Sequence, residues 1–157
     1  MPVPVRYHFR QRFAVSARKA YEWCTDFCEG SLDHKLMGDD SAIRKITRVA
    51  ESTLILTDTF RIDQGPVEKQ KLVVLYPDML SWNNTHLASA YKYSQFLYKV
   101  TADTKTTSHL DFWGLQLFYQ PEKMTQAEVA ELSAKLCKED ADAWKLLAKA
   151  MKKDLST

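Results

Sequence analysis

Asp58 is the side chain whose position in the sequence most strongly suggests chemistry. Residues 53–62 alternate as a β-strand does, and Leu56, Asp58 and Phe60 fall on the same face of that strand. A carboxylate on an apolar face is costly to bury unless it is paired or protonated, and burial would raise its pKa. Side chains of this kind are candidates for functional sites. The alternative is a bulge or a twisted strand end that turns Asp58 toward water.

Other polar side chains would accompany Asp58 if the apolar strand faces enclose a cavity. Tyr76 and Tyr98 share the phases of apolar strand residues and would bring hydroxyl groups into the same space. Gln11 is the polar residue in the inward phase of the first strand, and His86 stands near a strand end, where it would line the rim of a pocket. An enzymatic interpretation would use Asp58 with Tyr76 or Tyr98 as its acid and base.

The cysteines and the other histidines give no strong pattern for a metal or a covalent nucleophile. Cys24 and Cys28 lack further ligands at zinc-site spacing, and with Cys137 they form no disulfide framework, which predicts a reducing compartment. His8 and His109 fall in outward strand phases among charged residues, so we expect both at the surface. The sequence contains neither a Ser-His-Asp pattern nor a glycine-rich phosphate loop. We therefore expect no metal and no cofactor.

The composition predicts a single globular domain spanning residues 1–157. Hydrophobic residues make up 45% of the chain and charged residues 27%. The net charge of +2 is too small to indicate a nucleic-acid-binding protein. No apolar run approaches the roughly 18 residues that a membrane span needs. These features predict a cytoplasmic protein that has no membrane span and does not bind nucleic acid.

The first forty residues predict a strand and two helices. Residues 6–15 alternate between aromatic or apolar and charged side chains, which indicates a strand with one buried face. Ser16 is a typical cap for the helix that follows. Residues 29–40 favour a turn and a short second helix that carries apolar side chains, namely Leu32, Leu36 and Met37.

The middle of the chain predicts six strands joined by short turns. Proline, glycine and small polar residues separate the strands, and short connections favour an antiparallel meander. The expected strands are residues 41–50, 53–62, 67–76, 79–87, 91–102 and 106–119.

Residues 124–155 predict one long C-terminal helix with an apolar stripe. Thr125 and Glu128 have the spacing of a capping box, in which each side chain satisfies a backbone N–H group at the start of the helix. Apolar residues then recur at helical spacing along one face. A helix of that length needs a large apolar surface to cover, and the strands before it must supply that surface.

The order of elements resembles the helix-grip fold of the START-like (SRPBCC) superfamily. The resemblance covers nearly the whole chain, and its most suggestive stretch is an aromatic strand, the sequence Val-Ser-Ala at residues 15–17, and a helix that bears Trp23 and ends near Asp26 and Phe27. Members include lipid-transfer START domains, birch-pollen-allergen-like proteins and polyketide cyclases. The resemblance implies an α+β fold in which a curved, seven-stranded antiparallel sheet wraps around the long helix, with a cavity between them.

The inward strand phases and the last helix would line that cavity. The expected lining residues are Phe9, Phe13, Leu56, Asp58, Phe60, Val74, Tyr76, Phe96, Tyr98, Phe112, Trp144, Leu147 and Met151. Apolar and aromatic walls with a few polar groups are typical of small-molecule sites. The alternative is that these side chains only pack against one another as a core.

Three functions remain open at this point. The first is binding of an apolar or aromatic small molecule, lipid-like or polyketide-like, without covalent chemistry. The second is an enzyme of the cyclase or aromatase kind, in which the cavity orients a reactive chain and Asp58 moves a proton. The third is a protein-interaction or chaperone-assisting module, which predicts a filled interior and an exposed apolar patch.

Overall fold

One antiparallel sheet and a long helix dominate the computed structural model, which describes residues 1–31 and 42–156. The sheet has the strand order β1-β8-β7-β6-β5-β4-β3-β2. The elements are β1 (Val3–Phe13), α1 (Ala17–Thr25), β2 (Gly30–Ser31), β3 (Ala42–Ala50), β4 (Thr53–Ile62), β5 (Gly65–Tyr76), the 3-10 helix η1 (Pro77–Met79), β6 (Ser81–Ala88), β7 (Gln95–Ala102), β8 (Ser108–Phe118) and α2 (Gln126–Leu155).

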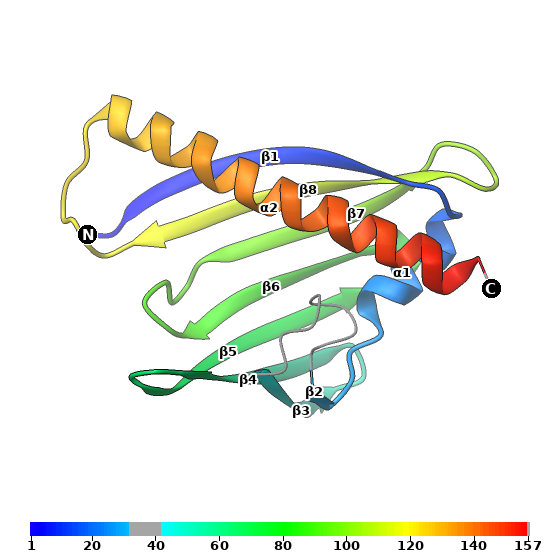
Figure 1. The fold of residues 1–157 in the computed structure, drawn as a ribbon, viewed down its shortest axis with the longest axis horizontal. Coiled ribbons are helices and arrows are strands. Elements are labelled where there is room, and N and C mark those ends of the chain that lie inside the picture. Colours follow the sequence, from blue (N-terminus) through cyan, green and yellow to red (C-terminus); the bar gives the residue numbers. More distant parts are fainter. Residues whose placement is uncertain (32–41, 157) are drawn as a thin grey trace.

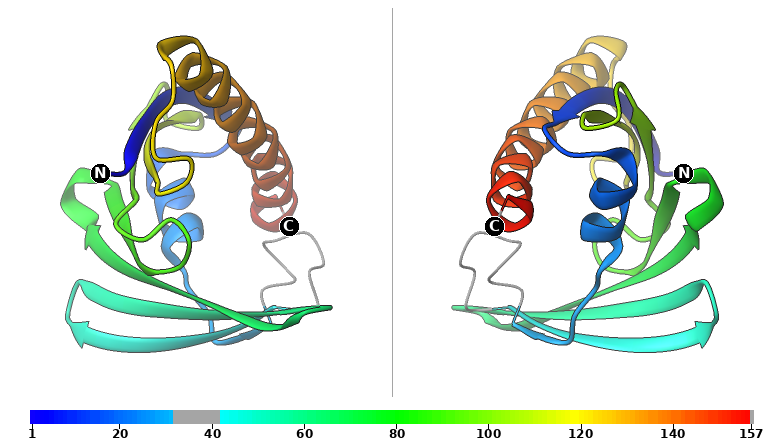
Figure 2. Two further views of the ribbon diagram at one scale, coloured as in Figure 1. Left: turned by 90° about the vertical axis from the view of Figure 1, so that its left-hand side faces the viewer. Right: turned by 90° about the vertical axis from the view of Figure 1, so that its right-hand side faces the viewer.

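The observed order confirms the predicted helix-grip arrangement. Seven long strands form the sheet, and the two-residue strand β2 adds an eighth at its edge. The expected second helix, with Leu32, Leu36 and Met37, lies outside the described residues. Figure 1 shows α2 crossing the sheet from the N-terminal end of β1 toward α1, and Figure 2 shows the sheet curving beneath both helices. The concave face of the sheet is therefore the covered face.

The start of α2 follows the sequence signal closely. Thr125 accepts a hydrogen bond from the Glu128 backbone N–H, and the Glu128 carboxylate accepts one from the Thr125 N–H. The basic residues of the last turn are Lys152 and Lys153, as the helix dipole favours.

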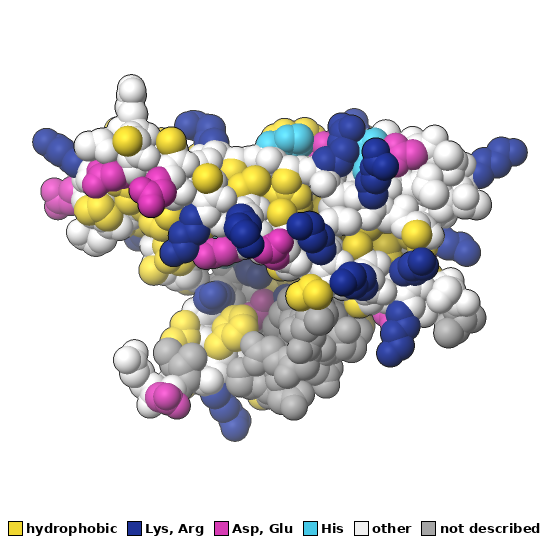
Figure 3. Space-filling view, turned by 45° about the horizontal axis from the view of Figure 1, so that its top comes forward, with side chains coloured by type: hydrophobic (Ala, Val, Ile, Leu, Met, Phe, Trp, Pro, Cys, Tyr) yellow, Lys and Arg dark blue, Asp and Glu magenta, His cyan; other side chains and the backbone are white. Residues whose placement is uncertain are grey.

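Figure 3 shows Lys and Arg side chains mixed with acidic ones across the face of the molecule that is turned toward the viewer. Mixed charges of this kind are typical of the solvated face of a surface helix.

Side chains from α2 cover the exposed edge of β1. The Ser133 hydroxyl donates a hydrogen bond of 2.6 Å to the backbone carbonyl of Arg6, and the Cys137 thiol lies 3.5 Å from the carbonyl of His8. An edge strand offers unpaired backbone groups to other chains. These contacts satisfy part of that edge and fix the helix along it.

The burial pattern confirms most of the predicted inward phases. The buried apolar side chains of the long strands include Val5, Tyr7 and Phe13 in β1, Leu54 and Leu56 in β4, Phe96 and Val100 in β7, and Leu110 and Phe112 in β8. Together with side chains from both helices they form one hydrophobic core. No helix within the described ranges is long and apolar enough to cross a membrane.

The predicted phase of β5 is wrong. Val73 is buried on the concave side, so alternation turns Val74 and Tyr76 toward the convex side, where Tyr76 is 43% exposed. The physical reason is that residues 72–75 are all apolar. A continuous apolar run carries no alternation from which the inward face can be read.

Candidate functional site

A pocket of about 160 Å³ lies between the concave face of the sheet and the two helices. Strands β3 to β7 form one wall, α1 and the residues after it form a second, and the C-terminal half of α2 forms the third. The lining residues are Trp23, Cys24, Asp26, Phe27, Cys28, Arg44, Leu56, Lys71, Val73, Trp82, Asn84, Tyr98, Trp144 and Leu147.

Aromatic rings make up much of this lining. The Trp82 and Tyr98 rings stack almost parallel, with centroids 4.7 Å apart, and Tyr98 also contacts Trp144 of α2 at 5.9 Å. The Trp23 indole N–H donates a hydrogen bond of 2.9 Å to Asp154, which ties α1 to the end of α2. Aromatic surfaces of this kind suit planar ligands, because offset stacking adds to the gain from apolar burial.

A cluster of three charged side chains interrupts the apolar wall on the side of β3, β4 and β5. Asp58 is 1% exposed, and its two carboxylate oxygens accept hydrogen bonds of 2.7 and 2.9 Å from Arg44. Lys71 lies on the next strand, with its Nζ 3.8 Å from Asp58 Oδ2. Arg44 and Lys71 both line the pocket, whereas Asp58 lies behind them.

Lys71 is the least satisfied member of this cluster. Burial lowers its pKa, Asp58 opposes that shift, and the Arg44 charge adds to it. Lys71 Nζ lies 3.8 Å from Asp58 Oδ2, which is long for a hydrogen bond, and the Lys71 side chain is 26% exposed. An ammonium group has three N–H donors, so this one contact leaves donors open to the pocket. The cluster therefore presents positive charge to the cavity.

Polar groups also occur on the side of β6 and β7. The Asn84 amide donates a hydrogen bond of 3.1 Å to the Tyr98 hydroxyl, and burial raises the Tyr98 pKa. Asn84 Oδ1 and His86 Nδ1 are buried without a hydrogen-bond partner in the described part of the chain. Burial, followed by the charges of Lys71 and Lys69, lowers the His86 pKa to about 4, so the ring is neutral at pH 7.

The structure brings only some of the predicted lining residues to the pocket. Leu56, Tyr98, Trp144 and Leu147 line it. Phe13, Phe96, Phe112 and Met151 are buried in the hydrophobic core, and Phe9 packs against that core. Phe60 is partly buried with the Lys69 ammonium 5.0 Å from its ring centroid, and Val74 and Tyr76 face away.

The outcome for the polar candidates is mixed. Asp58 is buried and paired, so the alternative in which it faces water is wrong. Gln11 bonds to the Arg12 carbonyl at the surface and orients nothing in the cavity. The expectation that His109 is a surface residue is also wrong, because it is 9% exposed. Sequence reasoning missed Arg44 and Lys71, which look like ordinary surface cations within alternating strands.

A partly buried polar pair lies outside the pocket, between β1 and α2. The Tyr7 hydroxyl donates a hydrogen bond of 2.5 Å to Asp140, and burial raises the pKa of both groups. The Tyr7 ring lies over Gly114 of β8, where a Cβ atom would come within 2.6 Å of it. Gly114 therefore makes room for the ring that reaches the helix.

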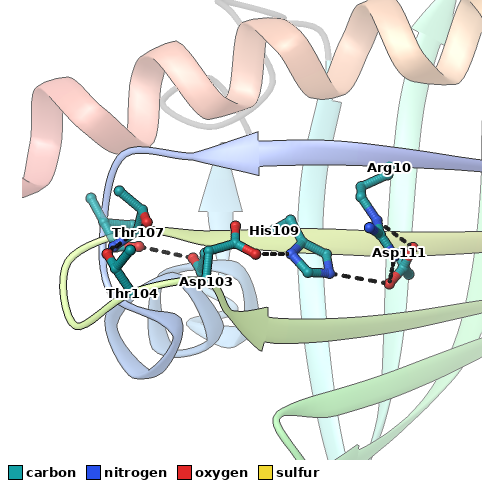
Figure 4. A network of polar contacts seen from close by, with 8 residues as sticks. Arg10, Asp103, Thr104, Thr107, His109 and Asp111 are labelled. Carbon is teal, nitrogen blue, oxygen red and sulfur yellow. Dashed lines mark hydrogen bonds and ion pairs between the residues drawn. The ribbon is translucent and has the colours of Figure 1, made fainter.

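A polar network on the opposite face of the sheet explains the burial of His109 (Figure 4). His109 Nδ1 lies 2.6 Å from Asp103, and its Nε2 lies 3.5 Å from Asp111. Arg10 donates two hydrogen bonds to Asp111, and His8 contacts the same carboxylate at 3.0 Å. The network joins β1, β8 and the β7–β8 turn, so its evident role is to hold these strands together.

The fold is shared with several proteins of known structure. An aromatase/cyclase from a Streptomyces species has a TM-score of 0.66 and 11% identity, over 96% of this chain and 95% of that one. Norcoclaurine synthase from Thalictrum flavum, in complex with dopamine and hydroxybenzaldehyde, has a TM-score of 0.66 and 16% identity, over 97% and 86%. The two-domain aromatase/cyclase StfQ of the steffimycin pathway has a TM-score of 0.72 and 11% identity, over 98% and 52%.

These structural matches establish a START-like helix-grip fold for this chain. Comparison with protein-family models found no match, and neither did comparison with curated protein sequences. At identities this low a shared fold does not carry a function with it. The function has to be argued from the pocket itself.

Replacing Asp58 with asparagine tests the role of the buried carboxylate. The change leaves Arg44 and Lys71 without a counter-charge, and we expect a loss of about 3–5 kcal/mol in unfolding free energy, measured by urea denaturation. Asp142→Asn is the matched control, because Asp142 contacts Lys138 and Lys145 at the surface. We expect little change for the control. Equal effects of the two substitutions would contradict the account.

The pH dependence of stability tests the network around Asp111. Burial favours its neutral form, but hydrogen bonds from Arg10 and His8 outweigh this and lower the Asp111 pKa below 3.8. A carboxyl with a lowered pKa in the folded state stabilises the fold at neutral pH, and that stability is lost as the pH falls below about 4. We expect Asp111→Asn to be less stable at pH 7 and to lose less on acidification. Parallel stability profiles for the two proteins would refute this.

Proposed function

We propose that this START-like protein binds a small aromatic molecule of about one ring in the pocket between the sheet and the helices. The observation that carries the proposal is the pocket itself, with its volume of about 160 Å³ and its aromatic walls. An apolar cavity of about 150 Å³ holds one benzene molecule. The volume therefore favours a single-ring compound over an extended lipid or polyketide chain.

The structural neighbours support this class of ligand. Norcoclaurine synthase is a helix-grip protein whose structure contains dopamine and hydroxybenzaldehyde, both of which have a single aromatic ring. The stacked Trp82 and Tyr98 rings and the Trp144 indole provide the flat surfaces that such a ring needs. Asn84 Oδ1 adds a buried acceptor that a donor group of the ligand would satisfy.

The cyclase-like alternative receives less support from the geometry. Its acid–base pair was Asp58 with Tyr76 or Tyr98. Asp58 is buried as that interpretation requires, but both of its oxygens accept hydrogen bonds from Arg44. Tyr76 lies on the convex side, and burial raises the Tyr98 pKa, which keeps its hydroxyl protonated. Binding without covalent chemistry needs none of these groups to exchange a proton.

The protein-interaction alternative predicted a filled interior. The pocket beneath α2 is at odds with that prediction. Trp113 and Leu97 are 41% and 48% exposed on the convex side, beside the His8 ring, which stacks on Trp113. This patch is small, and arginine side chains from β1 flank it, so it does not resemble the dry centre of an interface.

Filling the pocket from α2 tests the proposal. Leu147 lines the pocket, and Leu147→Phe would occupy space that the ligand needs. We expect benzamide, a neutral single-ring probe, to bind the unmodified protein saturably in isothermal titration calorimetry. The larger side chain of Leu147→Phe should weaken the binding of benzamide at least about tenfold, which corresponds to about 1.4 kcal/mol of binding free energy.

Leu146→Phe is the matched control, because Leu146 is the adjacent residue of α2 and is exposed. We expect it to bind benzamide as the unmodified protein does. Failure of the unmodified protein to bind single-ring compounds, or equal binding by both variants, would overturn the proposed function.

A further inference from the structure

The charged cluster gives the pocket an uneven charge distribution. Arg44 and Lys71 are two cations, and Asp58 is the one buried carboxylate between them. Asp26 also lines the pocket, but it is exposed to solvent, where water screens its charge. Among the residues that the structure describes, the two cations of the lining share one buried carboxylate, Asp58, which leaves one positive charge without a buried counter-charge.

The hydrogen-bond geometry identifies which cation remains available. Arg44 donates hydrogen bonds through Nε and Nη2 to the two oxygens of Asp58, so its charge is already paired within the protein. Lys71 approaches the same carboxylate only to 3.8 Å. The Lys71 side chain is 26% exposed, so its remaining N–H donors are open to the pocket, and an acceptor that enters the pocket would form a charge-assisted hydrogen bond with them.

The aromatic and cationic parts of the lining lie on neighbouring strands. Val73 of β5 pairs with Asn84 of β6, and Trp82 pairs with Tyr98 of β7. Lys71 pairs with His86 and Leu75 with Trp82, so Lys71 lies four residues, about 13 Å, along β5 from the level of the stacked rings. Val73 and Asn84 line the wall between these two levels, so a ring beside Tyr98 with a substituent directed along β5 would approach the Lys71 side chain.

We propose that the pocket selects a single-ring aromatic acid, whose carboxylate is bound by Lys71 with Arg44 nearby and whose ring packs among Trp82, Tyr98 and Trp144. This inference rests on the proposed function and narrows it from aromatic compounds to aromatic anions. The bound anion completes the charge balance of the cluster. It also offsets the shift that burial and Arg44 impose on the Lys71 pKa.

Benzoate and benzamide are the probes that test the inference, because they have nearly the same shape and differ in charge. Calorimetric titration at pH 7 would compare their dissociation constants in three proteins: the unmodified chain, Lys71→Met and Lys69→Met. Methionine preserves most of the lysine side-chain volume and removes its charge. Lys69 lies on the same strand and the same face but does not line the pocket, which makes it the matched control.

We expect the unmodified protein to bind benzoate at least about tenfold more tightly than benzamide, the value of one hydrogen bond to a charged group. Lys71→Met should lose that preference, while Lys69→Met should retain it. Equal binding of both probes by the unmodified protein, or a preference that survives in Lys71→Met, would overturn the inference and leave the proposed function standing. Failure of both probes to bind would overturn the two together.

Discussion

The buried Asp58 carboxylate is the constraint on which the interior of this protein depends. Removing ions from water costs several kcal/mol each, so a charge at this depth persists only with close partners. Arg44 supplies a bidentate pair from β3, and Lys71 supplies a second positive charge from β5. The three strands are therefore joined by charge as well as by backbone hydrogen bonds. The same arrangement leaves positive charge on the wall of an otherwise aromatic pocket.

The long helix determines the size of that pocket. Ser133 and Cys137 hold the first half of α2 along β1, while Trp144 and Leu147 of the second half face the pocket. The hydrogen bond between Trp23 and Asp154 fixes the C-terminal end against α1. The pocket beneath the helix has a volume of about 160 Å³, which matches the single-ring ligand that we propose.

The fold was predictable because its local signals are strong, whereas the site depends on details of register. The capping box of Thr125 and the alternation of β1, β7 and β8 are readable from residue types alone. The phase of β5 was not, because residues 72–75 are uniformly apolar. The pairing of Arg44 with Asp58 could not be predicted either, because it depends on a bulge in β3. Without the irregularity between Arg48 and Ala50, the hairpin would place Lys45 opposite Asp58. A one-residue shift in register exchanges the faces of a strand, so the partner of a buried charge cannot be identified from spacing alone.

A crystal structure of the protein with bound benzoate would test the central claim most directly. We predict that the ring lies against Trp82, Tyr98 and Trp144 and that the carboxylate lies within about 3.2 Å of Lys71 Nζ, the limit for a hydrogen bond from nitrogen. Benzoate bound with its carboxylate toward solvent, or bound only at the surface with the pocket unchanged, would contradict it. The orientation of one small molecule thus decides whether the charged cluster belongs to a binding site or serves only to join the strands.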